Sequence, residues 1–370
     1  MRILLYSHAF LPSLGGIERS SQLLAEALCA SGHQLDLVTA TPAGDPAWDR
    51  AQPYRIWRRP PLPRLLALIA RANVVHGNGA SLPAVLPALL LRRPALWTHQ
   101  AWQLLSVDGL GWADGGPTPL DPAASIAFYR RRLPLLAWVR QALLLRLRRA
   151  VAFRLAANVA ISHWMAQRQP LPRLQVIPNP VSLAAHPWSP PASRPIPLLF
   201  LGRLVSEKGL DVLLEALALL AAAPAPLHPR LLVVGDGPMR QPWQQLTLRL
   251  GLAEQVSFAG AHPAAELPAL LNQARIGVVP SAWEEPMGLV AVELLAAGLI
   301  PVVAERGGLA ENIGSFGRCF ANGDAAALAA VLAALLNAPP APPAAEDWAA
   351  AFAPTAIAAR YCQIYRQISR

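Results

Sequence analysis

SAWEEPMGLVAVELLAAGLIPVV, residues 281–303, places a helix pattern directly before a strand pattern. Two acids and a proline, Glu284-Glu285-Pro286, precede a glycine and an apolar run that ends at Gly298. Proline in a first turn and glycine after a last turn are typical of a short helix, so we expect one to begin directly after Glu285. The apolar Leu299–Val303 then predicts a buried strand, as in an α/β protein.

The start of this helix predicts an anion site. Free backbone N–H groups and the positive dipole end favour an anion there, phosphate above all. Glu293 lies among apolar residues in the middle of the helix, and an unpaired buried charge is costly. We therefore expect Glu293 to bind a polar ligand, or else to form a salt bridge or face solvent.

The whole chain has the composition of a globular protein. Its 370 residues are enough for two domains, and 54% are hydrophobic while 15% are charged. The apolar runs are too short to span a membrane, and we interpret the N-terminus as a first strand rather than a signal peptide. Three widely spaced cysteines predict neither a disulfide framework nor a metal site, which fits a cytoplasmic protein.

The charge is unevenly distributed along the chain. Residues 1–180 contain 20 arginines and 8 acidic residues, a net charge of +12, whereas the remainder carries −2 of the total of +10. No acid occurs between Asp121 and Glu207. This asymmetry favours an anionic partner such as a membrane surface, a phosphorylated lipid or a nucleic acid. A general bias of the composition towards arginine is the alternative.

Strand and helix patterns alternate from the beginning of the chain. Arg2–Ser7, Glu18–Ala30 and Gln34–Thr39 predict a strand, a helix and a strand, with Gly15-Gly16 at the start of the helix. Further strands are predicted at Asn73–His76, Ala95–His99, Asn158–Ser162, Leu198–Gly202, Leu231–Val234, Val256–Phe258 and Gly277–Val279. The alternation predicts two doubly wound parallel sheets.

A proline-rich segment, HPWSPPASRPIP at 186–197, divides the two halves. Five prolines in twelve residues are typical of a stiff extended connector. We therefore expect an N-terminal domain at 1–185, a linker at 186–197 and a second domain at 198–345. Residues 346–370 would form a terminal helix, whose pattern runs from Asp347 to Gln367.

The loops after the strands of the second domain carry the residues that point to chemistry, because ligands of open α/β sheets lie at the carboxyl ends of the strands. Arg203 and Lys208 follow the first of these strands, and Lys208 is the only lysine beside 31 arginines. Two cations at a helix start predict a clamp for a diphosphate, with a surface ion pair as the alternative. Glu285 and Glu293 would lie about 12 Å apart in a continuous helix, a span that fits the two ends of a nucleotide-sugar.

Two segments, Tyr54–Ala72 and Leu133–Leu155, mix arginine with leucine and tryptophan. This mixture is typical of an interfacial helix on anionic lipid, or of an ordinary amphipathic helix with a solvated arginine face. The membrane or acceptor candidates in this basic half are Arg58, Arg59, Arg64 and Arg131. No aromatic platform or recognition-helix pattern accompanies the arginines, so we do not expect a nucleic acid as partner.

Over nearly its whole length the sequence resembles the family 4 retaining glycosyltransferases of GT-B fold (glycosyl transferases group 1). The resemblance is carried by GGIERSSQLLAEALCASGHQLDLVT at 15–39, NVVH at 73–76, THQ at 98–100, NVAIS at 158–162, VIPNPV at 176–181, FLGRLVSEKGLDVLLEAL at 200–217, VVGDGP at 233–238, FAG at 258–260 and PSAWEEPMGLVAVELLAAGLIPVVA at 280–304. It implies two Rossmann-like domains that face each other across a cleft, with the terminal helix returning to the N-terminal domain.

The resemblance also implies roles for individual residues. Arg203 and Lys208 would hold the donor diphosphate, and Glu293 would bind the ribose. Glu285 and His99 would contact the donor sugar and are the catalytic candidates. The remaining donor-binding candidates are Gly15, Gly16, Gly235, Gly288 and Leu289. Met287, Pro180, Asn73 and Asn158 depart from the usual family pattern, and Met287 leaves the identity of the sugar open.

The expected function is therefore metal-independent, retaining transfer of a sugar from a nucleotide donor, with no cofactor beyond that co-substrate. A UDP- or GDP-sugar is the expected donor. The charge asymmetry predicts a lipid-linked or otherwise anionic glycan acceptor at the inner face of the plasma membrane. The alternatives are a nucleotide-sugar-binding protein without catalytic activity and, less favoured, a basic nucleic-acid binder.

Overall fold

The computed structural model describes residues 1–13, 15–42, 44–181, 193–263, 265–338, 348 and 350–369. The chain divides into two compact units. Unit 1 comprises Met1–Ala113, Pro117–Ser182 and Ala351–Arg370, and unit 2 comprises Asp114–Gly116 and Leu183–Ala350. Most of the predicted linker, residues 186–192, and the predicted start of the terminal helix at Asp347 lie outside the described residues.

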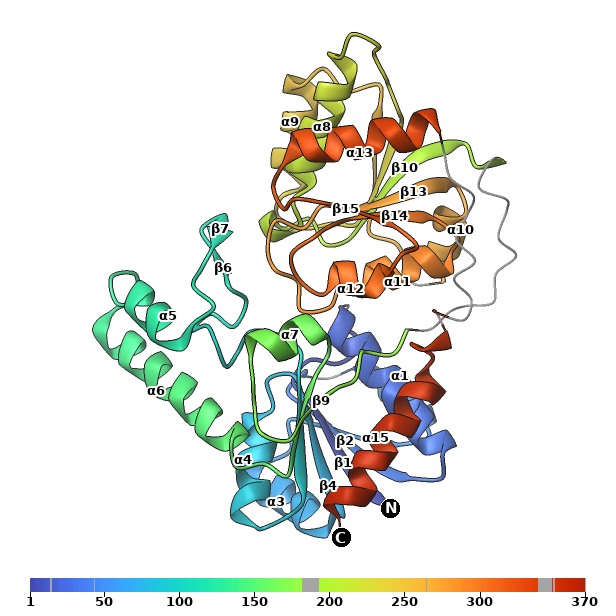
Figure 1. Cartoon of the computed structure of the whole chain (residues 1–370). Helices are drawn as coiled ribbons and strands as arrows, with labels where there is room; N and C mark the ends of the chain where they lie inside the picture. The colour runs from blue at the N-terminus through green and yellow to red at the C-terminus, as the bar shows by residue number, and fades with distance from the viewer. Residues whose placement is uncertain are drawn as a thin grey trace. The chain divides into compact units, whose positions relative to one another are not determined.

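Unit 1 is built on a seven-stranded parallel sheet with the order β3-β2-β1-β4-β5-β8-β9 (Figure 1). Its strands are β1 (Arg2–Ser7), β2 (Gln34–Thr39), β3 (Arg55–Arg58), β4 (Val74–Asn78), β5 (Ala95–His99), β8 (Ala157–Ala160) and β9 (Leu174–Val176), and a separate two-stranded pairing joins β6 (Trp112–Ala113) to β7 (Gly116–Pro117). The central strands are buried and largely apolar, as expected for a parallel sheet covered on both faces.

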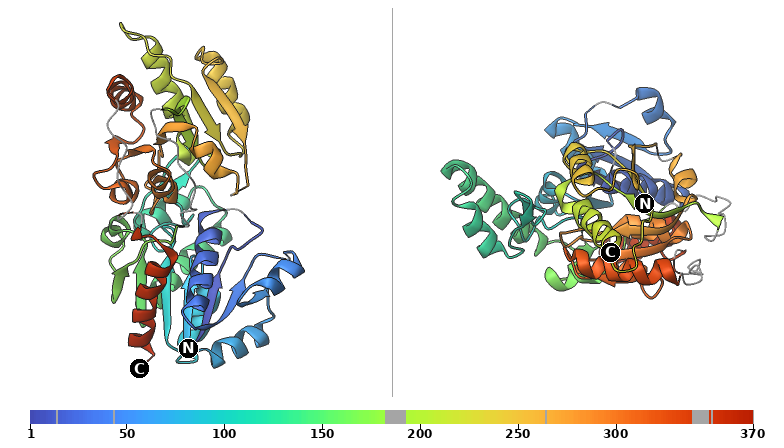
Figure 2. Two further views of the ribbon diagram at one scale, coloured as in Figure 1. Left: turned by 90° about the vertical axis from the view of Figure 1, so that its right-hand side faces the viewer. Right: turned by 90° about the horizontal axis from the view of Figure 1, so that it is seen from above.

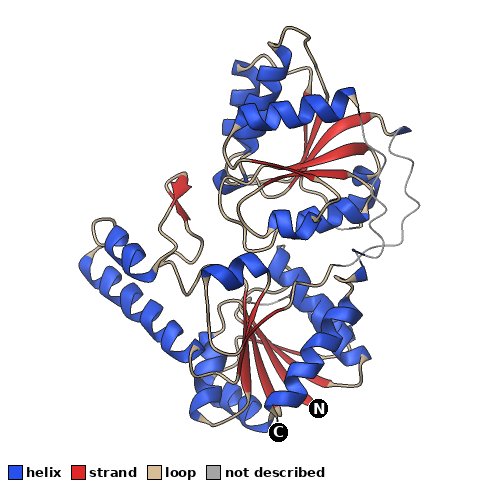
Figure 3. Cartoon of the chain, viewed as in Figure 1, coloured by secondary structure: helices blue, strands red, loops and turns tan. Residues whose placement is uncertain are grey.

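The helices of unit 1 lie on both faces of this sheet, apart from two that project away from it (Figure 3). They are α1 (Gly16–Ala30), α2 (Pro46–Ala51), α3 (Leu62–Arg71), α4 (Leu82–Leu90), α5 (Pro122–Tyr129), α6 (Leu135–Ala152), α7 (His163–Arg168) and α15 (Pro354–Ile368). The last helix, α15, packs beside α1 (Figure 2) and belongs to unit 1 although it follows the whole of unit 2 in the chain. The predicted return of the C-terminal helix is therefore correct.

Unit 2 repeats this plan with a six-stranded parallel sheet of order β12-β11-β10-β13-β14-β15. The strands are β10 (Ile196–Leu201), β11 (Leu231–Val234), β12 (Val256–Gly260), β13 (Ala274–Val279), β14 (Ile300–Ala304) and β15 (Arg318–Phe320). The helices are the 3₁₀ turn η2 (Ser206–Lys208), α8 (Leu210–Ala221), α9 (Arg240–Arg249), α10 (Leu267–Leu271), α11 (Leu289–Ala296), α12 (Leu309–Ile313) and α13 (Ala325–Asn337). Both sheets have the doubly wound arrangement, which confirms the predicted fold class.

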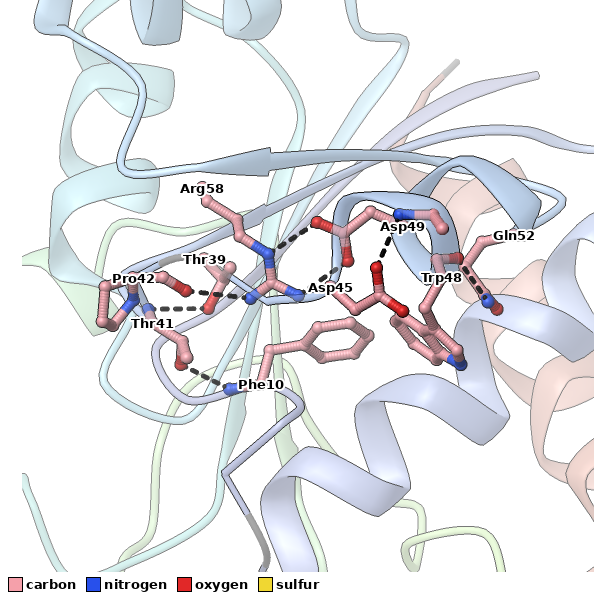
Figure 4. Close-up of polar contacts among 10 residues, drawn as sticks. Phe10, Thr39, Thr41, Pro42, Asp45, Trp48, Asp49, Gln52 and Arg58 are labelled. Atoms are coloured by element: carbon pink, nitrogen blue, oxygen red, sulfur yellow. Dashed lines mark hydrogen bonds and ion pairs between the residues drawn. The ribbon is translucent and has the colours of Figure 1, made fainter.

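The segment 54–72 is not a single interfacial helix. Its first part is the edge strand β3, and its second part is α3, which buries Leu65, Leu68 and Ile69 in the core. Arg58 forms a two-bonded ion pair with Asp49 (Figure 4), in which Nε and Nη2 lie 2.7 and 2.8 Å from the carboxylate oxygens. Only 11% of the Arg58 side chain is exposed, so it fixes the edge of the sheet and is not an open contact for a membrane.

The segment between β5 and α6 is organised around the carboxylate of Asp108. This side chain accepts five hydrogen bonds, from the backbone N–H groups of Leu110 and Gly111 and from the hydroxyls of Ser106, Thr118 and Tyr129. Burial alone would raise the pKa of Asp108, but these donors hold the pKa below its ordinary value. The ionised carboxylate therefore ties the loop to α5.

Among the described residues, no helix is long and apolar enough to cross a membrane.

Candidate functional site

The carboxyl edge of the unit 2 sheet brings Lys208 and Glu285 together. Strands β10 and β13 are neighbours, so the loops that follow them adjoin. Lys208 Nζ donates to Glu285 Oε1 at 2.6 Å, and Ser281 Oγ donates to the same oxygen at 2.5 Å. The two charges lie 77 positions apart in the sequence, and the order of the strands unites them.

This ion pair is largely shielded from water. Glu285 is 5% exposed, and 20% of the Lys208 side chain is exposed. Burial alone would raise the pKa of Glu285, but the charge of Lys208 and the hydrogen bonds from Lys208 and Ser281 hold the pKa below its ordinary value. Glu285 is therefore ionised at neutral pH. The ammonium of Lys208 also lies 5.8 Å from the ring centroid of Trp283, within the range of a cation–π contact.

The helix of the 281–303 stretch begins later than its proline indicates. Residues 284–288 form a loop, and α11 begins at Leu289. Glu285 is held outside the helix by a β-bridge to Gly307 and by the N–H of Gly308, which donates to the Glu285 carbonyl at 2.7 Å. Gly288 has a φ of 81°, a left-handed conformation that cannot continue a helix and that favours glycine. The predicted helix N-terminus at Pro286 is wrong, and so is the continuous helix between Glu285 and Glu293.

Three other predicted donor-binding residues lie in the same unit. Glu293 is half-buried in the middle of α11. Arg203 follows β10 with 64% of its side chain exposed, and its Nη2 lies 3.8 Å from Glu207 Oε1. Gly235 directly follows β11 and has a φ of 138°, and a Cβ at this position would lie 1.8 Å from the Gly202 carbonyl. The close approach of these two loops therefore requires glycine.

In unit 1 the glycine pair marks the start of α1, as predicted. Gly15 is the N-cap residue and Gly16 is the first residue of the helix. The carboxylate of Glu18, a buried side chain of the first turn, folds back so that a Cβ at Gly15 would lie 2.5 Å from its Oε2. Ser13 Oγ donates to Glu18 Oε1 at 3.1 Å. An acid in the first turn stabilises a helix dipole, and here it lies where the sequence predicts a bound phosphate.

His99 is the last residue of β5 and is 3% exposed. Its Nε2 lies 3.0 Å from Asn158 Oδ1, and its ring packs against that of Trp97 with centroids 5.1 Å apart. Burial lowers the pKa of His99 to about 4, an effect that the hydrogen bond to Asn158 partly opposes. His99 is therefore neutral at physiological pH and can exchange hydrogen bonds but cannot serve as a cation.

A buried network of amides and hydroxyls beside His99 was not predicted from the sequence. Gln100 Nε2 donates to Asn78 Oδ1 and to Asn179 Oδ1, each at 2.7 Å. Asn78 Nδ2 donates to Ser21 Oγ at 2.8 Å, and Ser21 Oγ lies 2.7 Å from Ser7 Oγ. The network joins the carboxyl ends of β1, β4 and β5 to α1. A signal for it was present, because polar residues directly follow several apolar strands.

Each unit thus collects its own share of the predicted site at the carboxyl edge of its sheet. Unit 1 contains Gly15, Gly16 and His99, and unit 2 contains Arg203, Lys208, Gly235, Glu285, Gly288, Leu289 and Glu293. The roles of these residues in binding and catalysis stay predictions.

Among the membrane or acceptor candidates, Arg59 donates to the Ala40 carbonyl, Arg64 stacks over Trp57, and Arg131 is exposed.

Known proteins share the fold of this chain. HepE of Anabaena, solved in complex with UDP, superposes with a TM-score of 0.68 and 19% identity over 100% of this chain and 98% of that one. Glycogen synthase of Mycobacterium tuberculosis is 28% identical over 92% of this chain and 87% of its own length. An uncharacterised glycosyltransferase of Methanocaldococcus jannaschii is 36% identical over 31% of this chain, a match that spans 29% of that relative.

Family models divide the chain at the same place as the proline-rich segment. Residues 14–185 match the model of Glycosyltransferase Family 4, and residues 186–351 match that of Glycosyl transferases group 1. The two matches follow each other without a gap and include the candidate residues of both units. The chain therefore belongs to the family 4, group 1 glycosyltransferases and has the GT-B fold.

Proposed function

We propose that this glycosyltransferase moves a hexose from a nucleotide-sugar donor with retention of configuration and without a metal ion. The observation that carries the proposal is the Lys208–Glu285 pair at the carboxyl edge of the unit 2 sheet. A cation held in place beside an ionised carboxylate offers one group for a phosphate and one for a sugar hydroxyl. HepE of Anabaena has been solved with UDP-glucose, which favours a nucleotide-sugar here as well.

Lys208 would bind the donor diphosphate with Arg203 beside it. The bond to Glu285 limits the motion of the ammonium, so little reorganisation is needed when a phosphate arrives. Positive charge at this point stabilises the departing nucleoside diphosphate and does the work that a metal ion does in other enzymes. The N–H groups at Gly16, Gly288 and Leu289 would contribute further donors to the phosphates.

The sugar and the ribose would be held by the remaining candidates. Glu285, ionised at neutral pH, would accept hydrogen bonds from the donor sugar, and Glu293 would accept those of the ribose. His99 would contact the sugar as a neutral group, because its pKa of about 4 excludes a charged form under physiological conditions. In a retaining reaction the leaving phosphate would accept the proton of the acceptor hydroxyl.

The acceptor is proposed to be a lipid-linked or anionic precursor of an envelope polysaccharide or glycolipid. The argument is electrostatic, since residues 1–180 carry a net charge of +12. An enzyme with this charge would work at the inner face of the plasma membrane, where anionic lipids concentrate.

A nucleotide-release assay with UDP-, GDP- and ADP-sugars, with and without a lipid extract, tests the proposal. We expect release from one donor class that rises with the lipid extract and persists in excess EDTA. NMR of the product should show the anomeric configuration of the donor. Arg203→Ala should lower release strongly, whereas Arg249→Ala, an exposed arginine on α9, should not. Donor binding without any release or transfer would instead identify a nucleotide-sugar sensor.

A further inference from the structure

Helix α6 exposes an apolar stripe that the fold of unit 1 does not cover. Of its 18 residues, only Ala142, Leu145, Val151 and Ala152 are buried. The exposed fractions are 85% for Leu136, 38% for Val139, 57% for Leu143 and 41% for Leu147. Exposing this many large aliphatic side chains on one helix is unfavourable in water, so the surface needs a partner.

The four exposed side chains share one face of the helix. At 3.6 residues per turn, Leu136, Val139, Leu143 and Leu147 fall within an arc of about 80°. With Arg140 and Leu144 they line a shallow groove along α6. Helices α5 and α6 project away from the sheet of unit 1 (Figures 1 and 2), so this sheet does not cover the exposed side chains of α6.

Arginines border the apolar stripe on both sides. Arg140 and Arg146 are exposed, and on the helix they fall to either side of the leucines, within about 20° of the edges of the arc. No acid occurs from residue 122 to residue 206, so no carboxylate of this segment neutralises them. An apolar stripe between cations is the pattern of a helix that lies in a bilayer interface, with leucines among the acyl chains and guanidinium groups at the phosphates.

We propose that the α6 face, defined as Leu136, Val139, Arg140, Leu143, Arg146 and Leu147, docks on an anionic lipid bilayer. This inference deepens the proposed function and rests on it, because it names the surface that would bring the enzyme to a lipid-linked acceptor. A second copy of the chain fits this face poorly. Two α6 faces would place arginine against arginine, with no acid of the segment to separate them.

Vesicle flotation of the full chain tests the proposal. The probes are vesicles of phosphatidylcholine alone and vesicles in which about a third of the lipid is phosphatidylglycerol. The wild type should bind the anionic vesicles at least tenfold more tightly, and high salt should weaken that binding. Equal binding to both vesicle types, or binding to neither, would overturn the proposal.

Two sets of variants assign the binding to α6. Leu136→Ser/Leu143→Ser/Leu147→Ser should lower vesicle partitioning at least tenfold, because the apolar contact is lost. Leu219→Ser/Leu248→Ser removes leucines that are 47% and 67% exposed in unit 2 and should bind like the wild type. Unchanged binding by the triple variant would show that α6 is not the docking surface.

A second comparison of variants tests the arginines of the α6 face. Arg140→Gln/Arg146→Gln should lose about tenfold or more of the binding to anionic vesicles. Arg249→Gln/Arg318→Gln removes two exposed arginines of unit 2 and leaves the α6 face intact, so it should bind like the wild type. Equal losses from the two pairs would show that only net charge matters and would contradict a docking face.

Two further measurements separate this proposal from its rivals. A wild type that is dimeric in analytical ultracentrifugation, and monomeric after the leucine substitutions, would assign the α6 face to a second copy and overturn membrane docking. Release of nucleotide from the donor in the absence of lipid should be the same in the wild type and the α6 variants. Vesicle binding by a wild type that turns over no donor would refute the proposed function but not the docking surface.

Discussion

At the scale of single residues, the pairing of Lys208 with Glu285 has the sharpest consequence. Lys208→Ala is expected to lower nucleotide release by about 10²–10³-fold, because a preorganised charge at the leaving group is lost. It should also lower the free energy of unfolding by on the order of 3 kcal/mol, because Glu285 would remain buried without its cation. Nucleotide release and urea unfolding measure the two effects.

A double-mutant cycle provides the control. In a Glu285→Gln background, Lys208→Ala should cost clearly less stability, because a neutral amide needs no counter-ion. The same loss in both backgrounds would mean that the two side chains are not coupled. The ion pair between Lys208 and Glu285, and therefore this loss of stability, was not predicted from the sequence.

Buried histidines give the protein a dependence on pH at the same scale. Burial lowers the pKa of His76 to about 3 and that of His99 to about 4, whereas both titrate near 6.5 when unfolded. Below pH 6.5 the unfolded state binds protons that the folded state does not. The free energy of unfolding therefore decreases as the pH is lowered, by up to about 1.4 kcal/mol per pH unit for each histidine. Urea unfolding between pH 7.5 and 5 measures this slope.

Substitutions show which histidines cause the slope. His76→Gln should make it shallower, whereas His228→Gln, an exposed residue of unit 2, should leave it unchanged. If both variants keep the full wild-type slope, the loss of stability at low pH is caused by carboxylates and not by His76.

At the scale of elements, α15 is fastened to the unit 1 sheet by a buried chain of hydrogen bonds. Tyr365 OH lies 2.7 Å from His76 Nδ1, while His76 Nε2 and Tyr361 OH both lie 2.9 Å from Thr98 Oγ1. Tyr365→Phe should lower the free energy of unfolding by about 1–3 kcal/mol, because it leaves one nitrogen of His76 buried without a partner. Thermal or urea unfolding measures the change.

Tyr54 offers a matched control for this substitution. It is 4% exposed, and its hydroxyl has no hydrogen-bond partner among the described residues. Tyr54→Phe should therefore cost nothing or stabilise the protein slightly. A loss as large as that of Tyr365→Phe would show that the hydrogen bond to His76 contributes nothing specific.

Elements with a strong apolar pattern were predictable from the sequence, and edge elements were not. The strands β1, β2, β5 and β11 have the predicted bounds because central parallel strands are almost uniformly apolar. β3, with the sequence RIWR, lies at the sheet edge, where the arginines can reach solvent or Asp49, so its pattern resembled that of an interfacial helix. The start of α11 was misplaced because contacts of Glu285 with Gly307 and Gly308 override the local preference of Pro286.

The candidate site was predictable in its composition but not in its contacts. Lys208 stood out as the only lysine, and Glu285 stood out beside a proline. Their contact depends on β10 lying next to β13, a fact of topology that no local pattern contains. The side chain of Glu18 at the start of α1 was missed for a different reason, since an acid in a first turn is common and carries little information.

At the scale of the whole molecule, each unit has a core of its own. One cluster lies within unit 2, and two others lie within unit 1, one of which contains Ile357 and Ile364 of α15. Ile357→Ala/Ile364→Ala should lower the stability of unit 1 by about 2–5 kcal/mol for each substitution. Hydrogen exchange should then show lost protection in β1 and β4, with β10 and β13 unaffected.

The converse substitution tests the independence of the two cores. Leu332→Ala/Leu335→Ala removes comparably buried leucines from α13 and should lower protection in β10 and β13 alone. Loss of protection in both units from either pair would mean that the molecule unfolds as one body.

The place of α15 in unit 1 has a consequence for synthesis on the ribosome. The sheet of unit 1 has been translated by residue 176, but the helix that covers α1 follows the whole of unit 2. At the usual pace of translation the nascent unit 1 waits about 10–40 s with the α15-binding side of α1 bare. The whole of unit 2 is synthesised during that interval, so unit 1, although its sheet is translated first, can complete its own fold only after the last residues of unit 2 have been made.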